Sequence, residues 1–243
     1  MARASGRRVD EPREISIEPG FVRTADGSAL ISVGGTRVIC TASVDTNVPK
    51  WMAGRGSGWV TAEYGMLPAS TGERKRRDKG GKQDGRSVEI QRLIGRSLRC
   101  AIDMELLGER SVYVDCDVLE ADGGTRCASI TGGYVALQLA LQKLIDDGEL
   151  ARMPLVTSVA AISAGIVGGE ALLDLEYVED SQADVDANVV MTGDDGLVEV
   201  QATAERTPLS KASLDELLEL SAIGIAQLRD AQAVAVGGAL PGA

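Results

Sequence analysis

The sequence predicts an α+β fold, with mixed sheets and packed helices. Three observations support this class: short apolar or alternating runs separated by glycine turns, two long segments with helical spacing of apolar residues, and a capping sequence before a last helix. The order along the chain is strands, helix, strand, helix, strands, helix. We expect one domain over residues 1–243, with residues 1–13 as a basic, partly ordered N-terminal arm.

The first half opens with a predicted hairpin. Residues 28–33 and 36–44 are apolar or alternating runs that flank Gly34 and Gly35, a hairpin signature. A further strand is expected within residues 57–64. Residues 73–86 are rich in Lys, Arg and Gly and predict an exposed loop. A helix is predicted over residues 88–107, because apolar residues recur there at helical spacing, and Arg92, Arg96 and Arg99 align on another face.

The second half repeats the theme. A strand over residues 111–119 leads through a double glycine into a helix over residues 127–147. Strand-like runs follow at residues 155–165 and 170–177, joined around Gly168 and Gly169. Two more occupy residues 185–192 and 197–203, with a turn at 194–196. A capping box that begins at Ser213 predicts a last helix to about Ala231.

The amino-acid composition excludes several kinds of catalytic site. The chain has no histidine, which excludes Ser-His-Asp and Cys-His catalysis and leaves acid–base or metal work to carboxylates. Its four cysteines have no CxxC spacing, so we expect buried thiols rather than a zinc site or disulfides. No apolar run approaches the ~20 residues of a membrane span. We therefore expect a cytoplasmic protein with no membrane contact.

Charge is unevenly distributed. The formal net charge is −11, yet residues 72–99 carry ten Lys and Arg against four acidic residues, which makes this window +6 and the remainder −17. A concentrated basic patch on an acidic protein indicates a localised polyanion site. The simpler alternative is a solvated loop.

A phosphate site is predicted between the strand and helix of residues 111–147. Gly123 and Gly124 permit a sharp turn that exposes backbone amides, Thr125 adds a hydroxyl, and Arg126 adds a planar cation at a helix N-terminus. We call residues 123–126 the phosphate turn. An ordinary glycine turn with a threonine cap is the alternative.

Acidic residues gather further on. Residues 174–188, the acidic segment, contain six carboxylates and two side-chain amides, a composition that suits Mg²⁺. On one continuous strand Asp180 and Asp186 would be ~20 Å apart, too far to share a metal. They converge only if the chain turns near residues 181–183, and either Asp184 or Asp186 then lies beside Asp180. The alternative is an ordinary acidic loop.

Together these features point to phosphoryl transfer by positioning and charge neutralisation. Inorganic phosphate as the attacking group is anionic at neutral pH and needs no base, which fits the absence of histidine. Metal-bound water is the other possible attacker.

Long motifs in residues 58–68, 86–99, 115–126 and 179–188 resemble the ribonuclease PH family of phosphorolytic 3′→5′ exoribonucleases. The resemblance covers nearly the whole chain. It implies a ring-forming domain assembled as a homohexamer, a trimer of dimers. It also implies trimming of tRNA precursors and other RNA 3′ ends, rRNA among them, with phosphate as co-substrate. The reverse reaction adds nucleotides from nucleoside diphosphates.

The resemblance also implies site residues. Arg86, Gly124, Thr125 and Arg126 would bind phosphate. Asp180 and Asp186 would hold Mg²⁺ or Mn²⁺ and assist the leaving 3′-hydroxyl, and these two, with Arg86 and Arg126, would be catalytic. The residues implied to contact RNA are Arg74, Arg76, Arg77, Arg92 and Arg96.

Two positions depart from the family pattern: Ala202 and Arg206 stand where glycine is usual. Rival functions remain. A catalytically inactive ring subunit would lack the phosphate arginines or the acidic pair, whereas this chain has both. A hydrolytic nuclease would leave the phosphate turn and Arg86 unexplained. Polynucleotide phosphorylase carries two such domains, and this chain is too short for it.

Overall fold

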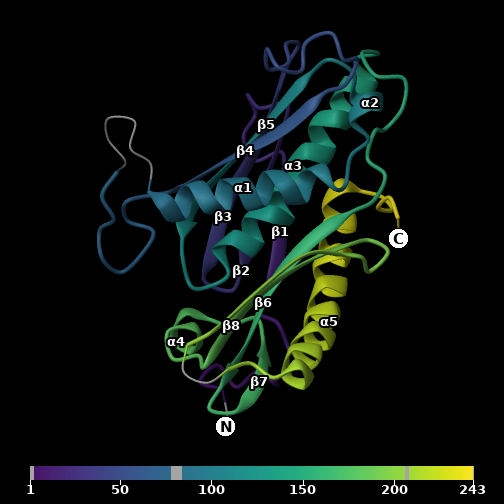
Figure 1. Ribbon diagram of the computed structural model, residues 1–243. Coiled ribbons are helices and arrows are strands. Elements are labelled where there is room, and N and C mark those ends of the chain that lie inside the picture. The colour runs from purple at the N-terminus through teal and green to yellow at the C-terminus, as the bar shows by residue number, and fades with distance from the viewer. Residues whose placement is uncertain (1–2, 78–83, 206–207, 243) are drawn as a thin grey trace.

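The computed structural model describes residues 3–77, 84–205 and 208–242 and confirms the α+β class (Figure 1). One sheet has five strands in the order β1-β2-β3-β5-β4. The strands are β1 (Ile15–Pro19), β2 (Gly27–Val33), β3 (Thr36–Asp45), β4 (Trp59–Met66) and β5 (Ser111–Glu120). Its neighbours run antiparallel except β4 and β5, which are parallel, so the sheet is mixed.

The second sheet is antiparallel and has four strands in the order β7-β6-β8-β9. They are β6 (Val159–Val167), β7 (Glu170–Leu173), β8 (Val185–Thr192) and β9 (Leu197–Ala204). The predicted glycine turns are present: Gly34, Gly168 and Gly169 all have positive φ. That conformation costs glycine little, which is why these hairpins were readable in the sequence.

Five helices are described: α1 (Gly85–Arg99), α2 (Met104–Leu107), α3 (Thr125–Asp146), α4 (Tyr177–Asp180) and α5 (Lys211–Val236). Helix α3 contacts β2, β3 and β5 of the larger sheet and β6 of the smaller one. Helix α1 packs on β4, and α5 runs along β6 and β7 (Figure 1). None of the helices in the described part of the chain is long and apolar enough to cross a membrane.

Helix α3 is the centre of the core. Most of its first seventeen residues are buried, which explains its apolar composition on nearly every face. One continuous hydrophobic cluster joins it to both sheets and includes Ile31, Val114, Ile162 and Val189. The N-terminus of α3 is therefore held at a fixed place between the two sheets.

Several predicted boundaries were wrong. Helix α1 ends at Arg99, and Asp103 begins a separate helix by accepting hydrogen bonds from the amides of Glu105 and Leu106. The apolar spacing continues past Arg99 because Ala101 and Ile102 are buried outside the helix. The last helix is capped by Ser210, not by Ser213, whose amide donates to the Ser210 hydroxyl.

The strand expected over residues 170–177 ends at Leu173. Asp174 follows with φ of 52°, a left-handed conformation that turns the chain away from the sheet and toward α4. Asparagine and aspartate adopt this conformation more readily than other side chains, but the alternating pattern of the sequence gave no sign of it.

The described part of the N-terminal arm is packed against β7, and Arg3 and Arg13 are buried. One expectation of burial needs correction. Three of the cysteines are buried as expected, whereas Cys100 is exposed.

Substituting Gly27 by alanine tests the seating of α3 on β2. A Cβ atom at Gly27 would lie 2.1 Å from the Ala136 carbonyl oxygen and 2.4 Å from the Ala140 amide nitrogen, both backbone atoms. Urea denaturation of Gly27→Ala should show a loss of unfolding free energy on the order of 3 kcal/mol. The control is Gly85→Ala, where a Cβ meets nothing within 4 Å. There the change should be neutral or stabilising by up to about 1 kcal/mol. Equal effects at both positions would contradict the packing described.

Candidate active site

A groove with a volume of about 790 Å³ collects most of the predicted site residues. Its walls come from the segment after β4, the start of α1, the phosphate turn, α4 and β8. The predicted residues that line it are Arg74, Arg86, Gly124, Thr125, Arg126, Asp180 and Asp186. Segments more than 100 residues apart in the chain therefore meet at one cavity, as expected from the three motifs taken together.

The phosphate turn has the backbone that its glycines predict. Gly123 and Gly124 have φ of 79° and 67°, and a Cβ atom at Gly123 would lie 2.5 Å from the Leu175 carbonyl oxygen. Both the conformation and the close approach require glycine there. The Thr36 hydroxyl holds the turn by donating to the Gly123 carbonyl at 2.6 Å and accepting from the Asp122 amide at 2.9 Å.

The first turn of α3 offers amides to a ligand. Gly124 is the N-cap residue, no side chain caps the helix, and the first helical hydrogen bond is the one from Ala128 to the Gly124 carbonyl. The preceding amides of the turn have no helical acceptor, and the helix dipole gives this end partial positive charge. The Thr125 hydroxyl does not cap the helix: it forms a 2.9 Å hydrogen bond with the Tyr64 hydroxyl. The geometry is that of an anion site.

The two groove arginines differ in how they are held. Arg126 donates to the Gln201 side chain at 2.7 Å and lies 3.3 Å from Glu89, so its guanidinium is fixed beside β9 and α1. Arg86 follows Asp84, whose side chain caps α1 by accepting from the Arg86 amide. Among the described residues the Arg86 guanidinium has no hydrogen-bond or ion-pair partner. One cation is therefore fixed by the protein and the other is available to a ligand.

The acidic segment separates into residues that point into the groove and residues that do not. Asp180 ends α4, the chain turns at residues 181–184, and Asp186 lies on β8, so both aspartates line the groove. This confirms the turn that their convergence required. The Asp184 carboxylate accepts from the Gly168 amide at 3.1 Å, away from the groove, so Asp186 is the aspartate that lies beside Asp180.

The electrostatics of the aspartate pair are unusual. Burial raises the pKa of Asp180, and the charges of Arg86 and Arg126 oppose that rise. Burial also raises the pKa of Asp186, and the negative charge of Asp180 raises it further. Neither carboxylate hydrogen-bonds to, or forms an ion pair with, any other residue in the described part of the chain. Two close, unneutralised carboxylates are the environment that a cation stabilises.

A divalent cation fits this pair in chemistry. Mg²⁺ is typically held by one or two carboxylates, with water and phosphate oxygens completing its coordination. No group of three or more His, Cys, Asp or Glu side chains within the described ranges is arranged to hold a metal ion. Asp180 and Asp186 would therefore share a cation with substrate oxygens rather than enclose it.

The remaining predicted arginines lie outside the groove lining. Arg76 and Arg77 are exposed on the segment after β4, and Arg92 is exposed on α1. Arg96 forms a 2.7 Å ion pair with Glu199. Arg99 does not join this face, because its guanidinium covers the Trp59 ring at 4.5 Å. Lys79 and Lys82 of the basic window, and Arg206, lie outside the described residues.

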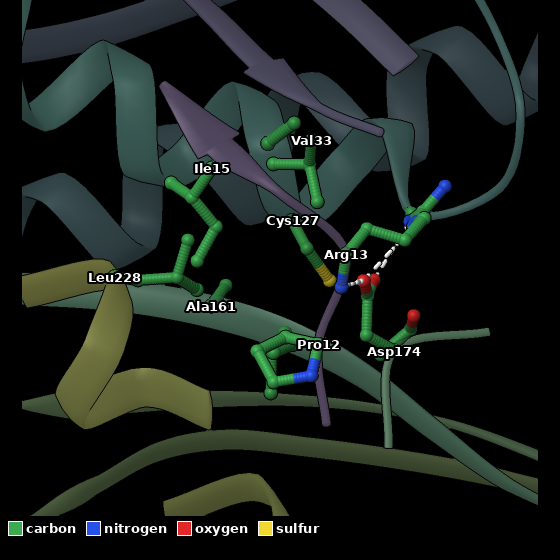
Figure 2. A pocket seen from close by; sticks show the side chains of 12 residues that line it. Pro12, Arg13, Ile15, Val33, Cys127, Ala161, Asp174 and Leu228 are labelled. Atoms are coloured by element: carbon green, nitrogen blue, oxygen red, sulfur yellow. Dashed lines mark hydrogen bonds and ion pairs between the residues drawn. The ribbon is translucent and has the colours of Figure 1, made fainter. Parts of the chain in front are cut away.

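Several residues at the groove had no recognisable signal in the sequence. The Tyr64 hydroxyl supports Thr125, and Ser163 on β6 places a buried hydroxyl beside Gly124. Arg13 and Asp174 form an ion pair behind the phosphate turn at 2.7 Å (Figure 2). These contacts join positions that are far apart in the chain, so no local sequence pattern predicts them.

Comparison with known proteins assigns the chain to a family. Residues 11–141 match the model of domain 1 of the 3′ exoribonuclease family, and residues 157–224 match the model of its domain 2. The chain belongs to the 3′ exoribonuclease family. It is an enzyme, a phosphorolytic 3′→5′ exoribonuclease and nucleotidyltransferase.

Relatives of this exoribonuclease family match over almost their full length. Ribonuclease PH of Roseobacter denitrificans is 55% identical over 234 residues, which cover 96% of this chain and 99% of that protein. Ribonuclease PH of Syntrophomonas wolfei is 53% identical over 238 residues, 98% of this chain and all of the other. Insertions or missing segments are therefore minor, and the groove residues lie within the matched region.

Solved structures of exoribonuclease-type folds agree with the architecture. A chain of the Archaeoglobus fulgidus exosome, described with RNA bound to the active site, superposes with a TM-score of 0.79 at 26% identity. The match covers 94% of this chain and 91% of that one. Rice Rrp46 has a TM-score of 0.78 at 18% identity and shows the same fold.

Replacing Asp186 by asparagine should raise stability while removing a groove charge. The pKa of Asp186 is higher in the folded protein than in the unfolded chain, so at neutral pH its ionised form is disfavoured by folding. In metal-free buffer at pH 7, Asp186→Asn should melt higher than the parent, by about 2 °C or more. The parent should gain stability as pH falls through the raised pKa, and the variant should lack that gain.

Asp194→Asn serves as the control of opposite sign. A hydrogen bond from the Thr192 hydroxyl lowers the pKa of Asp194, so its ionised form favours folding above the ordinary aspartate range. Its melting temperature should stay equal to that of the parent or fall. A lower melting temperature for Asp186→Asn would show that burial does not penalise this carboxylate.

Proposed function

We propose that this enzyme shortens tRNA precursors from their 3′ ends by attack of inorganic phosphate on the terminal phosphodiester, releasing nucleoside diphosphates. In reverse, it adds nucleotides from nucleoside diphosphates to RNA 3′ ends. One observation supports this most directly: Arg86, the first turn of α3 and Arg126 line the same groove as the Asp180–Asp186 pair. An anion site and a cation site thus face one cavity, and both arginines act electrostatically on both aspartates.

Phosphate is the group that the basic wall would hold. The amides of the phosphate turn, the Thr125 hydroxyl and the two guanidiniums present donors and positive charge to a dianion. Phosphate is already a nucleophile at neutral pH, so no general base is needed, and the chain has no histidine to supply one. A phosphate oxygen would bond to the terminal phosphorus as the bond to the 3′-oxygen of the preceding nucleotide breaks.

The leaving 3′-oxygen and the RNA phosphate face the acidic wall. Asp180 and Asp186 would hold Mg²⁺ or Mn²⁺, and such an ion supplies neutralisation of the charge that develops on these oxygens. The departing 3′-oxygen takes up a proton as its bond to phosphorus breaks, and a cation held by Asp180 and Asp186 would lower the charge on this oxygen until then. Arg126 is fixed by Gln201 and Glu89 before substrate arrives, so it is pre-organised for the attacking phosphate.

RNA outside the groove would follow the exposed basic residues. Arg74 lines the cavity, while Arg76 and Arg77 continue from it on the same segment and Arg92 follows on α1. Arg96 forms an ion pair with Glu199 and would therefore contribute less to RNA binding. We expect these side chains to contact RNA phosphates, and such contacts do not depend on the base sequence.

Assembly and location complete the proposal. One solved neighbour is a chain of the Archaeoglobus fulgidus exosome, and from the family resemblance we infer that this chain forms a multimer, a homohexamer built as a trimer of dimers. We infer that residues 1–243 act as one domain, because the groove takes residues from both sheets, and that the enzyme is cytoplasmic.

Phosphate dependence of product formation is the direct test. Purified protein, a 3′-extended tRNA and Mg²⁺ should yield nucleoside diphosphates only when phosphate is added. Arg86→Ala should raise the apparent KM for phosphate about 10- to 100-fold, the loss expected for charge-assisted hydrogen bonds. The Arg86 side chain has no hydrogen-bond or ion-pair partner among the described residues, so the melting temperature should fall only slightly, through the lost attraction to Asp180 and Asp186.

The matched control for that assay is Arg152→Ala, an exposed arginine beyond the C-terminal end of α3, at the opposite end of that helix from the phosphate turn. It should leave the phosphate KM unchanged. Nucleoside monophosphates formed without phosphate would mean hydrolysis and would remove the proposed attacker. RNA binding without any product would favour an inactive ring subunit.

The basic segment predicts a salt-dependent effect. The double variant Arg76→Ala, Arg77→Ala should weaken tRNA binding and reduce the slope of log affinity against log salt by about 1 to 2. Its KM for phosphate should stay at the parental value, since neither side chain lines the groove. Filter binding from 50 to 300 mM salt, about a sixfold range, measures both, and Arg152→Ala is the control for loss of an exposed arginine away from this segment. An unchanged slope would show that these arginines do not contact RNA.

A further inference from the structure

Three arginines of the N-terminal arm pack against the acidic segment. Arg3 and Arg13 are each only 7% exposed, and the Arg7 side chain is 10% exposed. Arginine is rarely buried unless it is paired, and breaking a buried pair costs far more than breaking one on the surface. The arm is therefore a structural part of the fold, although the sequence predicts only a partly ordered arm.

Asp174 is the main anchor of the arm. Its carboxylate accepts from the Arg13 amide at 2.8 Å, from Arg13 Nε at 2.8 Å and from Arg13 Nη2 at 2.7 Å. Its backbone carbonyl accepts from Arg3 at 2.9 Å and from Arg7 at 3.1 Å. This residue has the left-handed backbone that turns the chain from β7 toward α4. The arm thus stabilises the turn that directs Asp180 to the groove.

Arg3 holds the next part of the acidic segment. It forms two 2.7 Å hydrogen bonds with Glu179, the residue before Asp180, and a 2.9 Å bond with the Leu173 carbonyl. Glu179 in turn accepts from the Glu176 amide at 3.2 Å, a hydrogen bond that caps the start of α4. None of the hydrogen bonds described for Arg3 goes to the phosphate turn.

Arg13 differs because its guanidinium also contacts the phosphate turn. Nη1 donates to the Asp122 carbonyl, and Nη2 lies 3.5 Å from the Gly123 carbonyl. A Cβ atom at Gly124 would lie 3.2 Å from Nη2, so the group lies directly behind the turn. Figure 2 shows Arg13 beside Asp174, with Cys127 of α3 next to them. The Arg13 guanidinium therefore joins the phosphate turn to the acidic segment that carries Asp180.

We propose that Arg13 is a positioning residue that couples the phosphate turn to the segment carrying Asp180, so that phosphate and divalent-cation affinity both depend on it. Arg13 has this role only if the groove binds phosphate as proposed above. The chemistry requires arginine: the guanidinium has five donors in a fixed fork, which serve a carboxylate on one edge and two carbonyls on the other. Lysine retains the charge but not this bridging geometry.

Direct binding of inorganic phosphate and of Mn²⁺ to the purified protein tests the role without turnover. Calorimetry measures phosphate affinity, and Mn²⁺ electron paramagnetic resonance measures cation affinity. Arg13→Lys should weaken phosphate about tenfold and also weaken Mn²⁺, since it disturbs both walls. Arg3→Lys is the matched variant, equally buried and equally charged, and should weaken Mn²⁺ while phosphate affinity stays within about twofold.

A further control separates positioning from a general loss of stability. Arg110→Lys changes a half-buried arginine that donates to the Leu107 and Glu149 carbonyls, at the other end of α3 from the groove. It should lower the melting temperature without changing either affinity. If Arg13→Lys fails to fold by circular dichroism, Asp122→Ala replaces it. That side chain is 38% exposed, lies 3.9 Å from Arg13 Nη1 and accepts from the Tyr177 amide at 3.2 Å. Its loss should loosen the turn from both Arg13 and α4 and weaken phosphate binding about threefold.

The outcomes distinguish the two levels of the proposal. A parent protein that binds no phosphate would overturn the proposed function, and the role of Arg13 with it. A parent that binds phosphate, with Arg13→Lys binding equally well, would overturn the positioning role alone. Equal loss of phosphate affinity in Arg13→Lys and Arg3→Lys would also overturn it, because the arm would then act only through overall stability.

Discussion

The insertion of α3 between two sheets is the constraint on which the rest of the structure depends. A helix buried on nearly all faces cannot shift without exposing apolar surface on both sides, so its N-terminus is fixed as firmly as the core itself. Close approaches such as Gly27 against the Ala136 and Ala140 backbone leave no space for adjustment. The anion site is therefore built on the most rigid element of the fold, where pre-organised donors are most effective.

Buried charge is used in two opposite ways around the groove. Behind the phosphate turn, Asp174 and Glu179 are saturated by arginines of the arm, so they are structural and have no capacity left for a ligand. Facing the cavity, Asp180 and Asp186 lack partners among the described residues, and their pKa values are raised by burial. The first arrangement fixes the backbone that carries the second, because breaking one of these buried pairs would leave an uncompensated charge.

The sequence predicted the parts of the site that local chemistry determines. The glycines of the phosphate turn and of the hairpins follow from backbone preferences that a short stretch carries by itself. It did not predict that the arm would be buried, because an arginine-rich segment is normally solvated and its partners lie more than 160 residues away. The left-handed Asp174 was missed for the same reason: tertiary pairing, not propensity, holds it there.

The length of chain between Arg13 and Asp174 has a consequence for synthesis. Their separation of 161 residues means that the arm leaves the ribosome long before its partner exists. At roughly 5–20 residues per second, about 8–30 s pass before the arm can take its final place. During that time the larger sheet and the first turn of α3 can form, but the acidic wall cannot. A nascent chain therefore carries the basic surface before it carries the completed groove, and RNA-cutting competence is delayed until synthesis is well advanced.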